Sequence, residues 1–67
     1  MRITLKAARV NSDLTQKEAA KLLNISVETL CNYENGISFP NVPTLKKIER
    51  VYDVCYSDLI FLTANNA

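Results

Sequence analysis

The sequence predicts an all-α fold, a compact bundle of five short helices in one domain spanning residues 1–67. Its 67 residues include only one Gly and two Pro, too few for the many tight turns of an all-β fold. Apolar residues recur at helical spacing, and Ser, Thr, Asn and Asp stand between the apolar segments. The hydrophobic fraction of 48% is typical of a globular chain.

The composition argues against an enzyme or a metalloprotein. The chain contains no His and two cysteines, Cys31 and Cys55, which are not in Cys-x-x-Cys spacing. We therefore expect two free thiols and no metal site. The commonest general base is missing, and neither a Gly-rich phosphate loop nor a Gly-x-Ser-x-Gly elbow occurs. These absences predict no catalytic activity, no cofactor and no small-molecule substrate.

The charge and hydropathy of the sequence predict where the protein is located and which kinds of partner it binds. No apolar run approaches the roughly 20 residues that cross a bilayer, and no signal peptide is visible. The sequence thus predicts a cytoplasmic protein with no membrane partner. The net charge of +1 counts mildly against nucleic-acid binding, because domains that bind nucleic acid are usually basic. The placement of Lys and Arg matters more than their sum.

The first two helices are separated by a polar break. Arg2–Val10 carries apolar residues at helical spacing and is expected to pack on one side, and residues 11–13 end it. Thr15 and Glu18 then have the spacing of a capping box, in which each side chain accepts a hydrogen bond from the other residue's backbone N–H. A second helix is expected from Gln16 to about Leu23.

The next segment has the spacing of a helix-turn-helix. Asn24 tolerates the left-handed conformation that stops a helix. Ser26 is the N-cap of a third helix, Val27 to about Asn35, and Gly36 closes it. Two short helices joined by a three-residue turn are typical of this motif.

Two further helices are predicted after a loop. Asn41 caps the fourth, which tolerates Pro43 in its first turn and ends near Asp53. Ser57 caps a short fifth helix. Residues 59–62 are all apolar, and one helical face cannot bury four successive residues. The exposed remainder predicts a homodimer contact through Ile60, Phe61 and Leu62; the alternative is a terminal helix wrapped by the residues around it.

Two segments carry a resemblance to a known family. Leu14–Gly36, LTQKEAAKLLNISVETLCNYENG, resembles the Xre family of phage Cro and repressor-type DNA-binding domains. Pro43–Ile60, PTLKKIERVYDVCYSDLI, resembles that family's fourth and fifth helices. The resemblance implies a lambda repressor-like fold with its helix-turn-helix at about residues 16–35. It also implies sequence-specific binding of a double-stranded DNA operator, transcriptional regulation with repression favoured, and a homodimer. The alternative function is a protein-interaction module on the same fold.

Three positions depart from the family's pattern. Asn24 replaces the usual Gly of the turn, Glu49 stands where a small residue is usual, and Asp53 stands where Gly is frequent. Asn is a conservative exchange in the turn. We expect the Glu49 carboxylate to reach solvent or to pair with a Lys or Arg.

The resemblance places the third helix in the major groove and so implies base contacts from Val27, Glu28 and Asn32. Asn32 can bond adenine bidentately, Glu28 can accept from cytosine N4, and Val27 can touch a thymine methyl. Cys31 is interpreted as a bystander. The alternative is that all three are merely solvated, or that Glu28 acts only by excluding wrong sequences.

Contacts to the DNA backbone are expected around this helix. Gln16 occupies the family's phosphate-contact position at a helix N-terminus, where free N–H groups attract anions. The other candidates for backbone contact are Lys17, Thr29, Asn35 and Lys6. The alternative interpretation of each is an ordinary solvated side chain.

The resemblance also pairs Arg9 with Glu34 as a structural ion pair, partly buried between the first and third helices. Ile37 and Phe39 lie in a loop that lacks the basic residues usual in the family. These two side chains either tuck under the fourth helix or form a surface for a partner.

Overall fold

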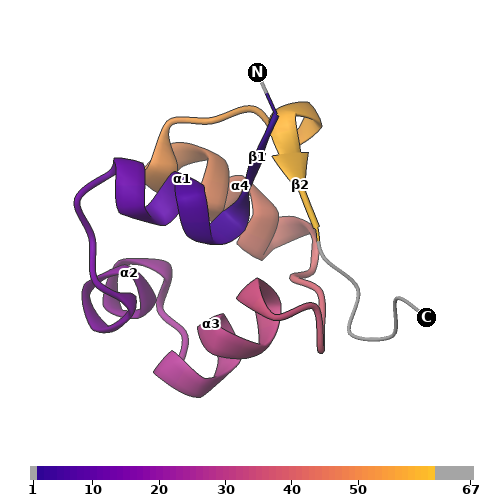
Figure 1. Ribbon diagram of the computed structural model, residues 1–67. Coiled ribbons are helices and arrows are strands. Elements are labelled where there is room, and N and C mark those ends of the chain that lie inside the picture. The colour runs from indigo at the N-terminus through magenta and orange to yellow at the C-terminus, as the bar shows by residue number, and fades with distance from the viewer. Residues whose placement is uncertain (1, 62–67) are drawn as a thin grey trace.

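Residues 2–61 of this chain are described by a computed structural model, and four helices enclose its core (Figure 1). They are α1 (Leu5–Asn11), α2 (Gln16–Leu23), α3 (Val27–Glu34) and α4 (Val42–Tyr52). Two short strands, β1 (Ile3–Thr4) and β2 (Leu59–Ile60), join the two ends of the described chain as a parallel pair.

Each helix begins at a side-chain cap. An oxygen of the N-cap residue accepts the backbone N–H three positions ahead, and the caps are Thr4, Thr15, Ser26 and Asn41. The capping box at α2 is complete, because Glu18 Oε1 accepts the Thr15 N–H at 2.9 Å while Thr15 Oγ1 accepts the Glu18 N–H at 3.1 Å. The backbone and then the side-chain hydrogen bond with Thr15 lower the pKa of Glu18. Three of the four caps confirm the sequence predictions.

A left-handed residue closes or follows each of the four helices, and Asp13, with φ 59°, is the one after α1. Asn24 closes α2 with φ 59°, as predicted, and Asp53 closes α4 with φ 54°. Gly36 follows α3 with φ 77°. Asn is among the few residues with a Cβ that tolerate this region, whereas Asp53 holds it at a larger steric cost than Gly would.

The core is built from all four helices. The largest fully buried side chains are Leu23, Leu30 and Ile48, from α2, α3 and α4. Ala19 and Ala20 on α2 are also buried. Since they have only a methyl group, α3 and α4 both pack closely against α2. This packing fixes the orientation of α3.

The predicted fifth helix is wrong, and the first helix begins later than expected. Residues 56–58 form a single 3₁₀ turn, after which Leu59 pairs with Ile3 and Ile60 with Thr4. The strand pair also takes the start of the predicted first helix, so α1 begins at Leu5. A helix of about five residues satisfies few of its own backbone groups. Pairing with β1 gives them partners instead.

Without a fifth helix, the residues of the predicted dimer contact that are described lie in β2 and directly after it. Leu59 is buried, while Ile60 and Phe61 are partly exposed and Leu62 lies outside the described residues. The contact itself stays a prediction. Within residues 2–61, no helix combines the length and the apolarity needed to cross a bilayer.

Candidate nucleic-acid interface

The turn between α2 and α3 sets the position of the candidate recognition helix. Asn24 reverses the chain, and the Ile25 N–H then donates to the Ala20 carbonyl oxygen at 3.0 Å. Ser26 Oγ accepts the Thr29 N–H at 3.0 Å and starts α3. The two helices lie together on one side of the molecule (Figure 1).

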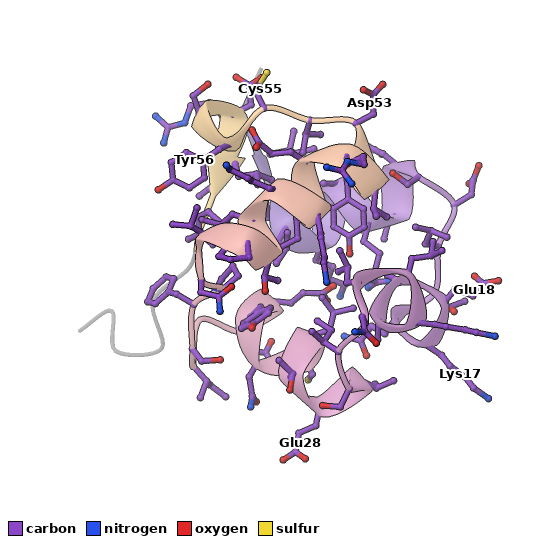
Figure 2. All side chains as sticks on the ribbon, turned by 180° about the vertical axis from the view of Figure 1, so that it is seen from behind. Lys17, Glu18, Glu28, Asp53, Cys55 and Tyr56 are labelled. Atoms are coloured by element: carbon purple, nitrogen blue, oxygen red, sulfur yellow. The ribbon has the colours of Figure 1, made fainter. Side chains whose placement is uncertain are left out.

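One face of α3 is buried and the opposite face is open. Leu30 and Glu34 point inward with exposed fractions of 0% and 6%. Glu28 and Val27 are exposed, and Asn32 is partly exposed. Figure 2 shows Glu28 projecting away from the body, at the opposite end from Asp53 and Cys55. Glu28 and Asn32 lie one turn apart on the same face, with Val27 at its flank. The three predicted base-contact residues are therefore all accessible from one side.

Cys31 belongs to this outer surface as well. Its sulfur lies 3.3 Å from Asn35 Nδ2, which donates a hydrogen bond to it. The sequence predicts a bystander role for Cys31 and a phosphate contact for Asn35, but not the hydrogen bond between them. Their i, i+4 spacing is the one signal that pointed to a contact.

Gln16 stands at the first position of α2 but its amide is already engaged. Gln16 Nε2 donates to Glu34 Oε1 at 3.0 Å. Because an amide NH₂ has two hydrogens, one donor and the adjacent backbone N–H groups stay available. Lys17, the next residue, extends into solvent (Figure 2).

Arg9 and Glu34 form an ion pair beneath these surface groups. Arg9 Nε lies 2.7 Å from Glu34 Oε2, and the exposed fractions of the two side chains are 9% and 3%. Arg9 Nη2 also donates to Oε1 at 3.4 Å, and Nη1 donates to the Leu14 carbonyl oxygen at 2.9 Å. The pair thus joins α1, the entry to α2 and the end of α3. Because Gln16 donates a hydrogen bond to Glu34, the ion pair also contacts the candidate phosphate site at the start of α2.

Tyr52 borders the same pair, which the sequence did not indicate. Its hydroxyl is buried and has no hydrogen-bond partner within residues 2–61. Burial and, after it, the negative charge of Glu34 raise the pKa of Tyr52 to about 12, while the positive charge of Arg9 opposes the rise. The hydroxyl is therefore held neutral beside a charged pair.

The remaining predicted contacts differ in availability. Lys6 and Asn35 are exposed. Thr29 is partly buried, and its hydroxyl shares a hydrogen bond of 2.8 Å with Ser26 Oγ. No group of three or more His, Cys, Asp or Glu side chains in the described part of the chain is placed to hold a metal ion.

Two other predictions concern residues outside α3. Glu49 is partly exposed, in agreement with the expectation that its carboxylate reaches solvent, and its Oε2 also accepts the Tyr56 N–H of the 3₁₀ turn at 2.7 Å. Ile37 and Phe39 do not tuck under α4, because 62% and 58% of their surfaces are exposed.

Comparison with known families agrees with this architecture. A helix-turn-helix family model matches residues 5–59, from the start of α1 to β2. The chain belongs to this helix-turn-helix family. The resemblance to Xre-type regulators is thereby confirmed. The match includes α2, the turn and α3, which carry the open face described above.

Three curated relatives are similar over most of this chain. The HTH-type transcriptional regulator ImmR of Bacillus subtilis is 46% identical over 75% of this chain and 39% of its own length. The antitoxin PezA of Streptococcus pneumoniae is 36% identical over 84% of this chain and 35% of its own length. The cryptic phage CTXphi transcriptional repressor RstR of Vibrio cholerae is 30% identical over 84% of this chain and 50% of its own length. The chain therefore spans between about a third and a half of these relatives. No solved structure matches it.

Proposed function

We propose that this domain binds double-stranded DNA sequence-specifically and regulates transcription, with repression as the favoured direction. The observation that carries the proposal is the open outer face of α3, held by a helix-turn-helix whose α2 is fixed by the buried core. In this motif the second helix enters the major groove and its first turns meet the base edges. Relatives named as a transcriptional regulator and as a repressor support the same function.

The base contacts we propose come from Val27, Glu28 and Asn32. The Asn32 amide suits the adjacent N6 and N7 of adenine, and the Glu28 carboxylate suits the amino group of cytosine. Val27, 42% exposed at the start of α3, suits a thymine methyl. Because α3 contains no Lys or Arg, it lacks the side chains that most often bind guanine.

The backbone contacts we propose flank α3. Gln16 is the central one, since it combines a spare amide donor with its position at the N-terminus of α2. Lys17, Lys6 and Asn35 are exposed and available to phosphates. The Thr29 hydroxyl would have to leave its hydrogen bond with Ser26 or share it. We further propose that the domain binds its operator as a homodimer.

The direct test is selection from a pool of random duplexes, followed by sequencing of the bound fraction. The wild-type protein should enrich a short motif. Asn32→Ala should lose about 1–3 kcal/mol on that motif and relax preference at one base pair. Gln16→Ala should weaken all sequences evenly.

Cys55→Ala is the matched control, because Cys55 is exposed at the end of the molecule opposite Glu28 (Figure 2). It should bind like the wild type. If the wild-type protein enriches no motif, the proposed function fails. If Asn32→Ala and Gln16→Ala produce the same small loss on every duplex, the division between base and backbone contacts fails.

The second candidate function is a protein-interaction module. It is favoured by the exposed apolar side chains of Ile37 and Phe39, which follow directly after the helix-turn-helix. A relative named as an antitoxin is similar over 84% of this chain. A domain of this kind would enrich no DNA motif in the selection above.

A further inference from the structure

The outward side of α4 carries an isolated group of positive charges. Lys46, Lys47 and Arg50 are exposed, whereas Ile48 and Tyr52 on the same helix are buried in the core. Lys46 and Arg50 lie one helical turn apart, and Lys47 is three positions before Arg50, so the three side chains share one side of the helix. These three side chains are here called the basic face.

No carboxylate neutralises the basic face. Within residues 2–61, none of its three cations forms an ion pair. Glu49, the one acidic residue of α4, flanks the face, and its Oε2 accepts the Tyr56 N–H at 2.7 Å. Like charges three and four positions apart destabilise a helix, and an ordinary solvated helix face alternates in sign. The arrangement therefore costs α4 stability, which a negatively charged partner would restore.

The positive charge of the domain is concentrated on this helix. The chain has 8 Lys and Arg and 7 Asp and Glu, for a net charge of +1. Without the three cations of the basic face, five positive charges remain against seven negative ones, a net charge of −2. The candidate recognition helix α3 contains two Glu and neither Lys nor Arg. A negatively charged partner is thus attracted to α4 more than to most of the surface.

The basic face and the outer face of α3 point in different directions. The buried side of α4 contacts α1 and α2. Figure 1 shows α1 in front of α4, so in the reversed view of Figure 2 the outward side of α4 faces the reader. Glu28 projects from the lower edge of that view. A duplex bound at α3 would therefore leave the basic face open to a second partner.

The surroundings of the basic face favour an acidic protein segment over a second nucleic acid. Val42, one turn before Lys46 and 63% exposed, extends the face with an apolar side chain that phosphates cannot match. Three cations also release too few counterions to hold a duplex alone. A helical segment with carboxylates at i and i+4 has the same one-turn spacing as Lys46 and Arg50. The Arg50 guanidinium can bind a carboxylate through two parallel hydrogen bonds.

We propose that the outward side of α4 docks an acidic helical segment of a partner protein. Carboxylates one turn apart face Lys46 and Arg50, and an apolar side chain of the partner faces Val42. The contact goes beyond the proposed function, because it needs no DNA. It also leaves α3 free, so that the domain can hold an operator and a partner protein at the same time.

The test uses a synthetic helical peptide with Glu residues one turn apart and a Leu one turn further along, and a second peptide with Gln in place of each Glu. The amide NMR signals that shift on adding the first peptide to the wild-type protein should gather at residues 42–50. The second peptide should shift none. Lys46→Gln combined with Arg50→Gln should weaken binding of the first peptide about 2- to 30-fold, because two exposed ion pairs are lost.

Arg2→Gln combined with Lys21→Gln is the matched control. It also removes one Arg and one Lys, both exposed and both outside α4, and it should bind the peptide like the wild type. Circular dichroism should show both double variants folded, because all four side chains are exposed. Equal peptide affinities of the two double variants would overturn the inference. So would an acidic peptide that shifts no signal, or one that shifts signals near every exposed Lys and Arg alike.

Operator binding separates this contact from the proposed function. On duplexes selected with the wild-type protein, the two double variants should bind equally tightly and with the same salt dependence. A salt slope smaller by about 2 for the α4 variant alone would assign the basic face to DNA phosphates and overturn the inference. If the wild-type protein enriches no DNA motif, the proposed function fails, and the peptide titration still decides whether α4 docks an acidic segment.

Discussion

Removing the Glu34 carboxylate should destabilise this domain far more than removing an exposed carboxylate from the same helix. Glu34→Ala leaves the Arg9 guanidinium, whose side chain is 9% exposed, without its 2.7 Å partner. Breaking one side of a buried pair costs about 3–5 kcal/mol, because the remaining charge stays away from water. Gln16 also loses the acceptor at 3.0 Å.

This loss is large compared with the whole stability of the domain. A chain of 67 residues has a free energy of unfolding of about 3–10 kcal/mol. We therefore expect Glu34→Ala to be largely or wholly unfolded at 37 °C. Urea unfolding followed by circular dichroism measures the difference at lower temperature, with the slope against denaturant checked for constancy.

Glu28→Ala is the matched control, because Glu28 is the same residue type, on the same helix and exposed. Its loss should stay below about 1 kcal/mol, the usual size of a charge effect at a helix N-terminus. A third variant, Arg9→Met combined with Glu34→Leu, should recover most of the lost stability, because it leaves no unpaired buried charge. Equal midpoints for Glu34→Ala and Glu28→Ala would refute the reasoning, and so would a double variant no better than Glu34→Ala.

Three further predictions follow from single residues. Tyr52→Phe should raise the free energy of unfolding by about 1 kcal/mol, since it removes a buried hydroxyl without a partner. Because burial raises the pKa of Tyr52 to about 12, above its usual 10, the folded state is favoured below pH 10 and loses stability as the pH rises from 10 to 12. The variant should lose less stability in that window, and its absorbance at 295 nm should lack the component that titrates near pH 12. Asp53→Gly should raise the free energy of unfolding by about 1 kcal/mol, because φ is 54° there and Gly has no Cβ to clash; a lower melting temperature would contradict this. Thr15→Ala should cost about 1 kcal/mol and bring the pKa of Glu18 part of the way back up towards 4.5, as an NMR titration would detect; an unchanged Glu18 titration would show that the Thr15 side chain contributes nothing to it.

Local sequence signals are sufficient to predict the helix-turn-helix. The bounds of α2, the left-handed Asn24 and the start of α3 at Val27 all follow from caps and apolar spacing within a few residues. Such signals are local, because a cap acts on a backbone group only two or three positions away. The outward direction of Glu28 follows in the same way, once Leu30 is known to face inward.

Features that depend on contacts between residues far apart in the chain are seen only in the folded structure. Leu59–Ile60 became a strand because Ile3–Thr4 lies beside it, a pairing across more than fifty residues that no local pattern records. The hydrogen bond from the Gln16 amide to Glu34 also joins residues far apart in the chain. The same holds for the position of the Tyr52 hydroxyl near the Glu34 carboxylate. Phe39 is 58% exposed although its ring meets that of Phe61, which in turn lies beside Tyr56. Hydrophobic spacing predicts that a side chain is buried. Whether the core has space for that side chain depends on the packing of the whole chain.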